Sequence, residues 1–128
     1  MSSIVLDASA MLALINQEPG SEKLSPELLD DAAVSAVNLA EVQGKLVSWG
    51  WSPDEAWADA TGVVRDVEAF TADHAQATGN LIAKTSSLGL SLGDLACLAL
   101  ALSLHAPVYT ADRSWKNLKL GSRIHVIR

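Results

Sequence analysis

Residues 91–112 read SLGDLACLALALSLHAPVYTAD, and this stretch gives the strongest indication of the fold. From residue 92 to residue 105 it is apolar on almost every side, which predicts a helix in the centre of the protein. Either Ser91 or Gly93 opens that helix. Pro107 then separates it from a short strand at residues 108–110. A buried helix that leads directly into a strand is a building unit of parallel α/β sheets.

The rest of the chain repeats this alternation of strand and helix. Strands are expected at residues 3–6, 32–35, 66–70, 108–110 and 124–127. Helices are expected at residues 8–16, 21–29, 38–49 with Asn38 as its cap, from Ser52 onward, 71–87 with a break near Gly79, and 92–105. The sequence therefore predicts one domain over residues 1–128. Its fold class is α/β: a three-layer α/β/α sandwich around a mostly parallel sheet of about five strands.

Composition limits the class of protein further. The chain has 128 residues, of which 49% are hydrophobic, which suits a globular domain with a full core. Its one cysteine, Cys97, excludes an internal disulfide and a cysteine-based zinc cluster, and we expect it to be buried. No secretory signal is visible, and the uncharged run of residues 95–104 is too short to span a bilayer. These features predict a cytoplasmic protein without a membrane anchor.

The charge is distributed unevenly along the chain. The net charge of −6 would by itself disfavour a nucleic-acid partner. However, residues 113–128 contain five Lys and Arg and no acid, whereas residues 1–112 carry −11. An acidic body joined to a basic segment is expected if one edge binds phosphate and another binds metal. Arg113 and Lys116 are therefore candidate phosphate-binding residues, although a solvated basic tail explains them equally well.

Four acidic residues follow or flank the predicted strands. Asp7 ends the first strand, and Asp112 follows the fourth strand by two residues. Glu41 and Asp94 are expected in the first turns of the helices that follow strand two and precede strand four. Because ligands bind at the carboxyl ends of strands in open parallel sheets, all four acids are expected at one edge.

Four carboxylates in a small site repel one another unless a cation lies between them. Mg²⁺ or Mn²⁺ suits such a set, because both ions prefer oxygen ligands. One or two such ions can activate a water and stabilise charge in phosphodiester hydrolysis. Each acid also has a purely structural interpretation as a helix cap, a first-turn acid or a turn residue. Spacing alone leaves both interpretations open.

The acids occur in segments that resemble a known family. Residues 4–15, 34–42, 90–102 and 108–115 read IVLDASAMLALI, VSAVNLAEV, LSLGDLACLALAL and VYTADRSW. These segments resemble the four acidic blocks of PIN domains, in order and at ordinary spacing, and most resemble VapC-type toxins of bacterial toxin–antitoxin pairs. The resemblance implies a PIN-type fold and an acidic centre of Asp7, Glu41, Asp94 and Asp112. It also implies that Ser9 and Thr110 support the carboxylates.

The same resemblance implies a function. The expected activity is Mg²⁺- or Mn²⁺-dependent endoribonuclease cleavage of RNA, in a homodimer that a small antitoxin inhibits. The region from Asp54 to Phe70 matches nothing specific in the family. The alternative is a catalytically silent PIN-fold module that binds RNA or protein.

Aromatic residues and histidines carry weaker signals. Trp49, Trp51 and Trp57 cluster near one helix junction and form either an apolar groove for the antitoxin or part of the core. Trp115 either stacks on a base or packs in the core. The three histidines have no ligand spacing, which disfavours a histidine acid–base nuclease.

Two other phosphate-handling classes fit less well. A haloacid-dehalogenase-type phosphotransferase needs a second Asp two residues after the first, and Ser9 stands there. A receiver domain needs adjacent acids after strand one, and Ala8 follows Asp7. It also needs a late Lys, and none occurs between Leu88 and Trp115.

Overall fold

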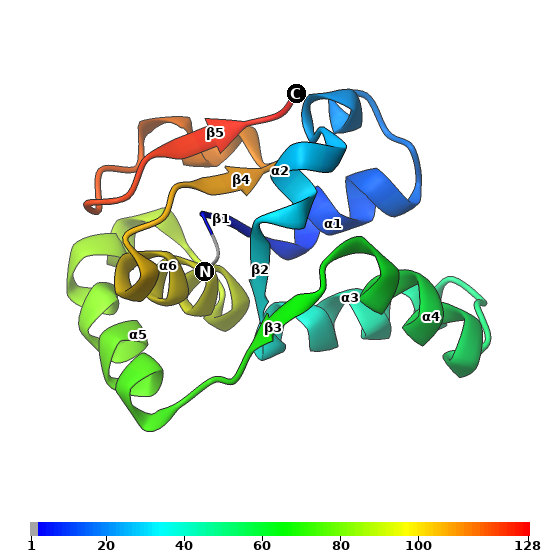
Figure 1. The fold of residues 1–128 in the computed structure, drawn as a ribbon. Helices are drawn as coiled ribbons and strands as arrows, with labels where there is room; N and C mark the ends of the chain where they lie inside the picture. The colour runs from blue at the N-terminus through cyan, green and yellow to red at the C-terminus, as the bar shows by residue number, and fades with distance from the viewer. Residues whose placement is uncertain (1–2) are drawn as a thin grey trace.

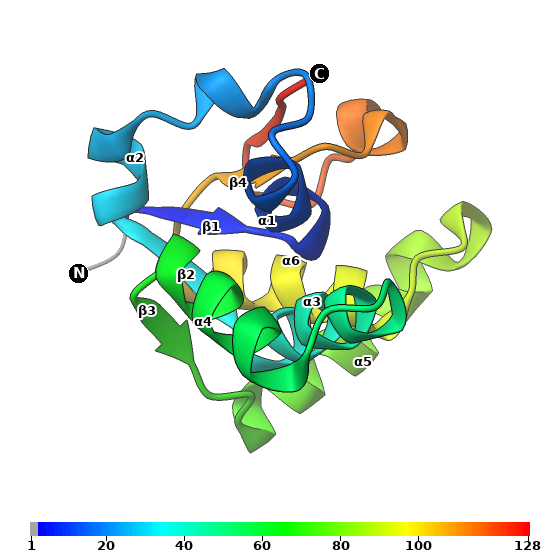
Figure 2. The same ribbon diagram turned by 90° about the vertical axis from the view of Figure 1, so that its right-hand side faces the viewer.

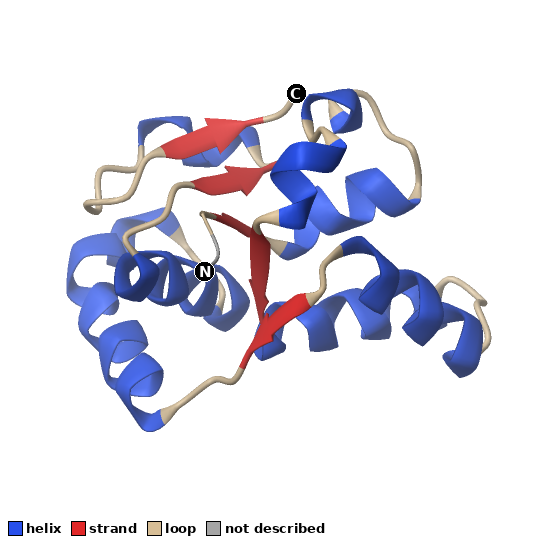
Figure 3. Cartoon of the chain, in the orientation of Figure 1, coloured by secondary structure: helices blue, strands red, loops and turns tan. Residues whose placement is uncertain are grey.

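The computed structural model describes residues 3–128, and within that range five parallel strands form one sheet. The strand order is β3-β2-β1-β4-β5, so β1 lies in the middle (Figure 1, Figure 3). The strands are β1 (Ile4–Leu6), β2 (Ala32–Ser35), β3 (Asp66–Glu68), β4 (Val108–Thr110) and β5 (Ile124–Val126). The chain builds outward from β1 first to one side and then to the other. The order therefore reverses between β1 and β4, which is where open α/β sheets bind ligands.

Helices cover both faces of this sheet (Figure 1). One face carries α1 (Ala8–Ile15), α3 (Ala36–Ser48) and α4 (Pro53–Val63), and α3 and α4 lie side by side (Figure 2). The other face carries α5 (Ala72–Thr85) and α6 (Leu92–Leu104). Short elements complete the chain: η1 (Ser21–Lys23), α2 (Pro26–Asp30), η2 (Ser86–Leu88) and η3 (Arg113–Asn117). The expected α/β/α fold class is confirmed.

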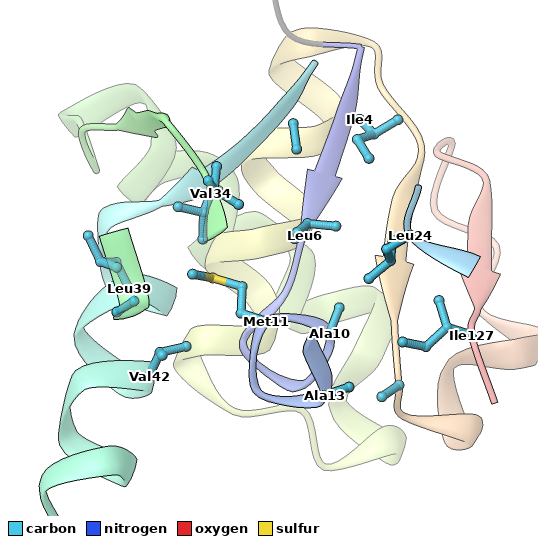
Figure 4. Packing of buried hydrophobic residues seen from close by; sticks show 14 of the residues in the cluster. Ile4, Leu6, Ala10, Met11, Ala13, Leu24, Val34, Leu39, Val42 and Ile127 are labelled. Carbon is cyan, nitrogen blue, oxygen red and sulfur yellow. The ribbon is translucent and has the colours of Figure 1, made fainter. Parts of the chain in front are cut away.

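Alternate residues of β1 enter two separate cores. Ile4 and Leu6 pack in a cluster with Met11 and Val42 on the α1 side (Figure 4). Val5 packs with the residues of α6 on the opposite side. Each large aliphatic side chain that is fully buried in this way stabilises the fold by about 1.5–3 kcal/mol. Because its alternate side chains are buried in both cores, β1 is fixed in the middle of the sheet. Asp7 follows it directly.

Several expectations are confirmed at the level of single residues. Ser52 caps α4 and Ser91 caps α6, as the sequence indicated. Cys97 is buried, and Trp115 is also fully buried in the core rather than free to stack on a base. Among residues 3–128, every helix is too short or too polar to cross a lipid bilayer.

Other expectations were wrong in their boundaries. Ser35, not Asn38, caps α3, because the Ser35 hydroxyl follows β2 directly and accepts a hydrogen bond from the Val37 backbone N–H. Glu41 therefore lies in the second turn of α3 instead of the first. The helix expected at residues 21–29 is divided into η1 and α2, because Pro26 must begin a new helix, which Ser25 caps.

Further differences concern the ends of elements and one glycine. The helix expected at residues 71–87 is α5, which runs through Gly79 without a break. Space around Gly79 is open, so nothing there forces the helix to bend. The strands expected at residues 66–70 and 124–127 are shorter, at Asp66–Glu68 and Ile124–Val126.

Gly20 is the position at which we expect the costliest glycine substitution for stability. Its φ is +97°, and a Cβ there would overlap the backbone carbonyl of Ile127, beyond β5. We expect Gly20→Ala to lower the free energy of unfolding by roughly 2–4 kcal/mol, from backbone strain plus displacement of the chain after β5. Urea denaturation measures this loss. Gly50→Ala is the matched control, because Gly50 has a φ of +99° but open space around it. Equal losses in the two variants would contradict a close-approach role for Gly20.

Candidate acidic site at the β1–β4 edge

Asp7 is the most buried acid of the candidate site. It follows β1 and caps α1, accepting a hydrogen bond from the Ala10 backbone N–H at 2.8 Å. Its side chain is only 4% exposed. Two hydroxyls also donate to it: Ser9 Oγ at 2.8 Å and Thr110 Oγ1 at 2.5 Å. The carboxylate therefore joins the end of β1, the start of α1 and the end of β4.

The orientation of the two hydroxyls is set by the chain after β4. Ser9 Oγ accepts from the Ala111 backbone N–H at 2.9 Å, and Thr110 Oγ1 accepts from the Asp112 N–H at 3.0 Å. Because each hydroxyl already accepts a backbone donor, its own proton is free to point at Asp7. The structure therefore brings Ser9, Thr110 and Asp7 together, in agreement with what the resemblance to PIN domains implied. The backbone of Ala111 and Asp112 is hydrogen-bonded to the two hydroxyls.

Burial and a neighbouring charge raise the pKa of Asp7, whereas its hydrogen bonds lower it. Desolvation raises its pKa to about 6 from an ordinary value of 3.8, and the nearby charge of Asp94 adds to the rise. The hydrogen bonds from Thr110, Ala10 and Ser9 lower the pKa but do not cancel the desolvation. A negative charge at Asp7 is thus costly without a cation beside it.

Glu41 reaches the site through a contact between α3 and α6. Asn38 Nδ2 donates to Glu41 Oε1 at 3.0 Å and to the Gly93 carbonyl at 3.0 Å. Gly93 lies so close to Glu41 that an added Cβ would overlap the Glu41 carboxylate. The missing side chain of Gly93 therefore makes room for the Glu41 carboxylate at the start of α6, one residue before Asp94.

Asn38 is the residue of this site whose role the sequence did not reveal. The sequence indicated it as a helix cap, but its side chain is 1% exposed and crosses to α6. Its Oδ1 is buried without a hydrogen-bond partner among the described residues. A buried unpaired carbonyl oxygen costs about 1–3 kcal/mol, so the position is not optimised for stability alone. The pairing of Asn38 with Glu41 three residues later was the only sequence signal available.

Asp94 has a local structural role as well as a place in the site. Its Oδ2 accepts from the Ser91 N–H at 3.0 Å, while Ser91 Oγ accepts from the Asp94 N–H at 3.1 Å, which forms a capping box. Its charge raises the pKa of Asp7. Asp94, Asp7 and Glu41 also raise the pKa of the Cys97 thiol, after the larger effect of burial. All three acids therefore lie within electrostatic reach of one buried point in α6.

Asp112 begins η3 and is exposed. Its Oδ1 accepts from the Ser114 backbone N–H at 2.9 Å and from Ser114 Oγ at 2.7 Å. The Asp112 backbone N–H donates to the Thr110 hydroxyl, and that hydroxyl donates to Asp7, so Thr110 links the two acids. The turn role that the sequence indicated is therefore present, because Asp112 lies two residues after β4 and caps η3, whereas its role in a metal site stays a prediction.

The donor chemistry of the four acids fits a hard divalent cation, since every donor is a carboxylate oxygen and Asp7 is held in a desolvated position. Their side chains do not form a ready ligand set, however. Across residues 3–128, no three His, Cys, Asp or Glu side chains are grouped so that they could hold a metal ion. Asp94 and Asp112 instead satisfy helix ends. Convergence of all four carboxylates on one point stays a prediction.

The structure places the remaining candidate residues in several parts of the fold. Arg113 and Lys116 are exposed on η3, directly after Asp112, and they line a groove with β5. Trp49 and Trp57 are 53% and 50% exposed, so the core interpretation of these two was wrong, whereas Trp51 is partly buried. His125 stacks on Tyr109 at a centroid distance of 4.7 Å.

Three solved structures have a similar fold at low sequence identity. VapBC from Salmonella typhimurium, solved bound to DNA, matches with a TM-score of 0.80, 19% identity and full coverage of both chains. VapBC2 from Rickettsia felis, bound to a promoter DNA fragment, matches with a TM-score of 0.76, 21% identity and 98% coverage of both. VapC20 from Mycobacterium tuberculosis, a toxin that cleaves the sarcin–ricin loop, matches with a TM-score of 0.75 and 21% identity over 94% of this chain and 99% of that one. At these identities the likeness shows the fold.

The sequence comparisons address the family. A comparison with curated protein sequences found no match. The family model described as PIN domain matches residues 4–120, which include all four acids and both hydroxyl residues. Since that match spans most of the chain, this protein belongs to the PIN domain family.

Proposed function

We propose that this protein is a metal-dependent endoribonuclease of the VapC toxin type, with Asp7, Glu41, Asp94 and Asp112 as its acidic centre. The observation that carries the proposal is the setting of Asp7: a desolvated carboxylate at the β1–β4 switch point, with Asp94 close enough to raise its pKa. Carboxylates accumulate at such an edge at a cost in stability, which a bound cation would offset. Membership of the PIN domain family and the VapC-like fold support a nuclease.

Each group of residues has a distinct task in the proposed reaction. Ser9 and Thr110 hold the Asp7 carboxylate in one orientation, because both hydroxyls donate to it while each accepts a backbone N–H from the chain after β4. Asn38 and Gly93 hold Glu41 against the start of α6. The proposed cofactor is Mg²⁺, with Mn²⁺ as a substitute; when bound, it supplies polarisation of a phosphoryl oxygen and a lowered pKa for the attacking water.

The direct test is RNA cleavage by the purified protein with and without divalent metal. We expect cleavage in Mg²⁺ or Mn²⁺ and none in excess EDTA, with restoration when Mg²⁺ is added back. RNA binding without cleavage under every metal condition would overturn the nuclease proposal. It would favour the alternative, a catalytically silent PIN-fold module.

The basic edge of η3 is the proposed RNA-binding surface. Arg113 and Lys116 are exposed and begin one residue beyond Asp112, whereas the rest of the chain, residues 1–112, carries −11 and repels RNA. Replacing both by Ala is expected to weaken RNA binding with little loss of sequence preference. The log–log salt slope should flatten by about 0.7 for each lost phosphate contact. Binding to a single-stranded RNA across a salt series measures this, and an unchanged slope would exclude both side chains from phosphate contact.

The proposed protein partner is a small antitoxin that binds the exposed apolar surface of Val47, Trp49 and Trp57 at the α3–α4 junction, together with the helices of residues 8–29, of which α1 packs against both α3 and α4. These three side chains are 40–53% exposed. An amphipathic helix of the antitoxin would cover them, and an Arg beyond it would reach the acids and compete with metal. We expect Trp57→Ala to weaken binding of the proposed antitoxin by at least about tenfold. Val67→Ala, at an exposed residue of β3, is the control; equal loss in both would point to unfolding.

We also propose a homodimer that acts in the cytoplasm, where its RNA substrate is found. A second apolar surface, of Ile82, Leu88 and Leu92, is 51–63% exposed and borders a cavity of about 400 Å³ between α5 and α6. This is a surface on which a second copy can pack. Sedimentation of the purified protein measures its oligomeric state, and a monomer at all concentrations would contradict the dimer.

A further inference from the structure

A groove of about 450 Å³ runs between η3 and β5. Three cationic and two aliphatic residues line it: Arg113, Lys116, Arg128, Ile124 and Val126. This combination differs from the acidic site beside it and from the purely apolar surfaces described above. A ligand that suits the groove must therefore carry negative charge and also present an apolar face.

The groove borders the acidic site through β4 and β5. Val126 is paired in register with Thr110, whose hydroxyl donates to Asp7. The Ile127 backbone N–H donates to the Thr110 carbonyl at 2.9 Å, which continues that pairing. Asp112 caps η3, and η3 forms the opposite wall of the groove. The groove is thus separated from Asp7 by strand β4 alone, and the residue that follows Asp112 lines it.

The two walls present different chemistry. Arg113 and Lys116 are three residues apart on a 3-10 helix, which has three residues per turn, so both lie on one face. Ile124 and Val126 are two residues apart on β5 and share a face of the strand, while His125 between them stacks on Tyr109. Arg128 donates a hydrogen bond to Glu18, which partly neutralises its charge. Arg128 therefore serves as part of the wall of the groove.

We propose that the η3–β5 groove is a nucleotide subsite, which holds the nucleotide of the RNA substrate next to the bond that is cleaved. Arg113 and Lys116 bind its phosphate, and its base lies flat against Ile124 and Val126. The inference rests on the proposed ribonuclease function for the identity of the ligand. A nucleotide is favoured over a simple anion, because an anion would leave the aliphatic side chains without a role, and every base has an apolar face.

The test is a methyl NMR titration of the whole protein in EDTA, with adenosine 5′-monophosphate as the probe. We expect saturable shifts of the Ile124 and Val126 methyl signals, and no such shifts with inorganic phosphate. Val126→Thr keeps the side-chain shape but replaces a methyl group by a hydroxyl, a loss of about 0.8 kcal/mol or roughly fourfold in affinity for the nucleotide. Arg113→Ala with Lys116→Ala should weaken the nucleotide further. Val67→Thr, at the opposite edge strand, is the matched control and should change nothing.

Each other outcome overturns the subsite. Unmoved methyl signals in the wild-type protein would exclude a base at this position, whatever the variants do. Equal binding of phosphate and nucleotide would reduce the groove to an anion site. A short polyglutamate peptide that shifts the methyl signals as strongly as the nucleotide would assign the groove to an acidic protein partner. Because the titration contains no metal and no cleavage step, its failure is distinguishable from failure of the nuclease proposal.

Discussion

Asp7→Asn is expected to abolish metal-dependent RNA cleavage and, without metal, to leave the fold as stable as the wild type or more stable at pH 8. The first effect follows because an amide cannot replace a carboxylate as a charged metal ligand. The second follows from burial, which raises the pKa of Asp7 to about 6. Above that pH the wild-type protein holds a desolvated negative charge, which the variant lacks.

The sign of the pH dependence is fixed by that raised pKa. An acid that binds its proton more tightly in the folded state stabilises the fold fully below its unfolded value, here 3.8, and loses this contribution as pH rises through about 6. The difference between the two values corresponds to ~3 kcal/mol as an upper limit. The raised pKa of about 6 already includes the opposing effect of the hydrogen bonds from Thr110 and Ser9, which lower the pKa.

Urea denaturation in EDTA between pH 4.5 and pH 8 measures this prediction. The stability of Asp7→Asn relative to the wild type should be highest at pH 8 and should decrease as the pH falls through 6. Asp73→Asn, an exposed acid in the first turn of α5, is the control and should change neither cleavage nor this profile. A large drop in stability at pH 8 would show instead that Asp7 serves mainly as the cap of α1.

The positions of Asp7 and Asp112 could be predicted from sequence because they depend on local patterns. Each follows a short apolar strand, and parallel strands bring their carboxyl ends to one edge. Ser9 and Thr110 were found only through the resemblance to PIN domains, and their hydrogen bonds to Asp7 agree with it. In these cases the residues that matter are within three positions of a strand end.

The environment of Glu41 could not be predicted in the same way. Its setting depends on how closely α3 approaches α6, and Gly93 lies 55 positions after Asn38. Ser35 and Asn38 are both good helix caps, so sequence preference alone could not decide between them. The competing use of Asn38, as a donor to a carbonyl on another helix, appears only when the two helices are packed.

Gly93→Ala is expected to reduce Mn²⁺ affinity and RNA cleavage by about 10–100-fold, the range seen when a residue that orients a metal ligand is lost. An added Cβ would overlap the Glu41 carboxylate, so this side chain must leave its position beside Asp94. The hydrogen bond from Asn38 Nδ2 to Glu41 would be lost with it. Stability should change little, because the added Cβ would meet only the far end of the exposed Glu41 side chain, and alanine is favoured over glycine in a helix by about 0.5–1 kcal/mol.

Two comparisons make the prediction specific to the Gly93–Glu41 contact. Gly79→Ala is the matched control: Gly79 also lies within a helix, but with open space around it, so this variant should gain stability without a change in Mn²⁺ affinity. In a Glu41→Ala background, Gly93→Ala should have no further effect on Mn²⁺ affinity, because the carboxylate that it displaces is already gone. Calorimetric Mn²⁺ titration of the four proteins in this cycle measures the coupling. Additive losses would show that Gly93→Ala acts through the backbone of α6. They would also exclude a contribution of the Gly93–Glu41 contact to metal binding.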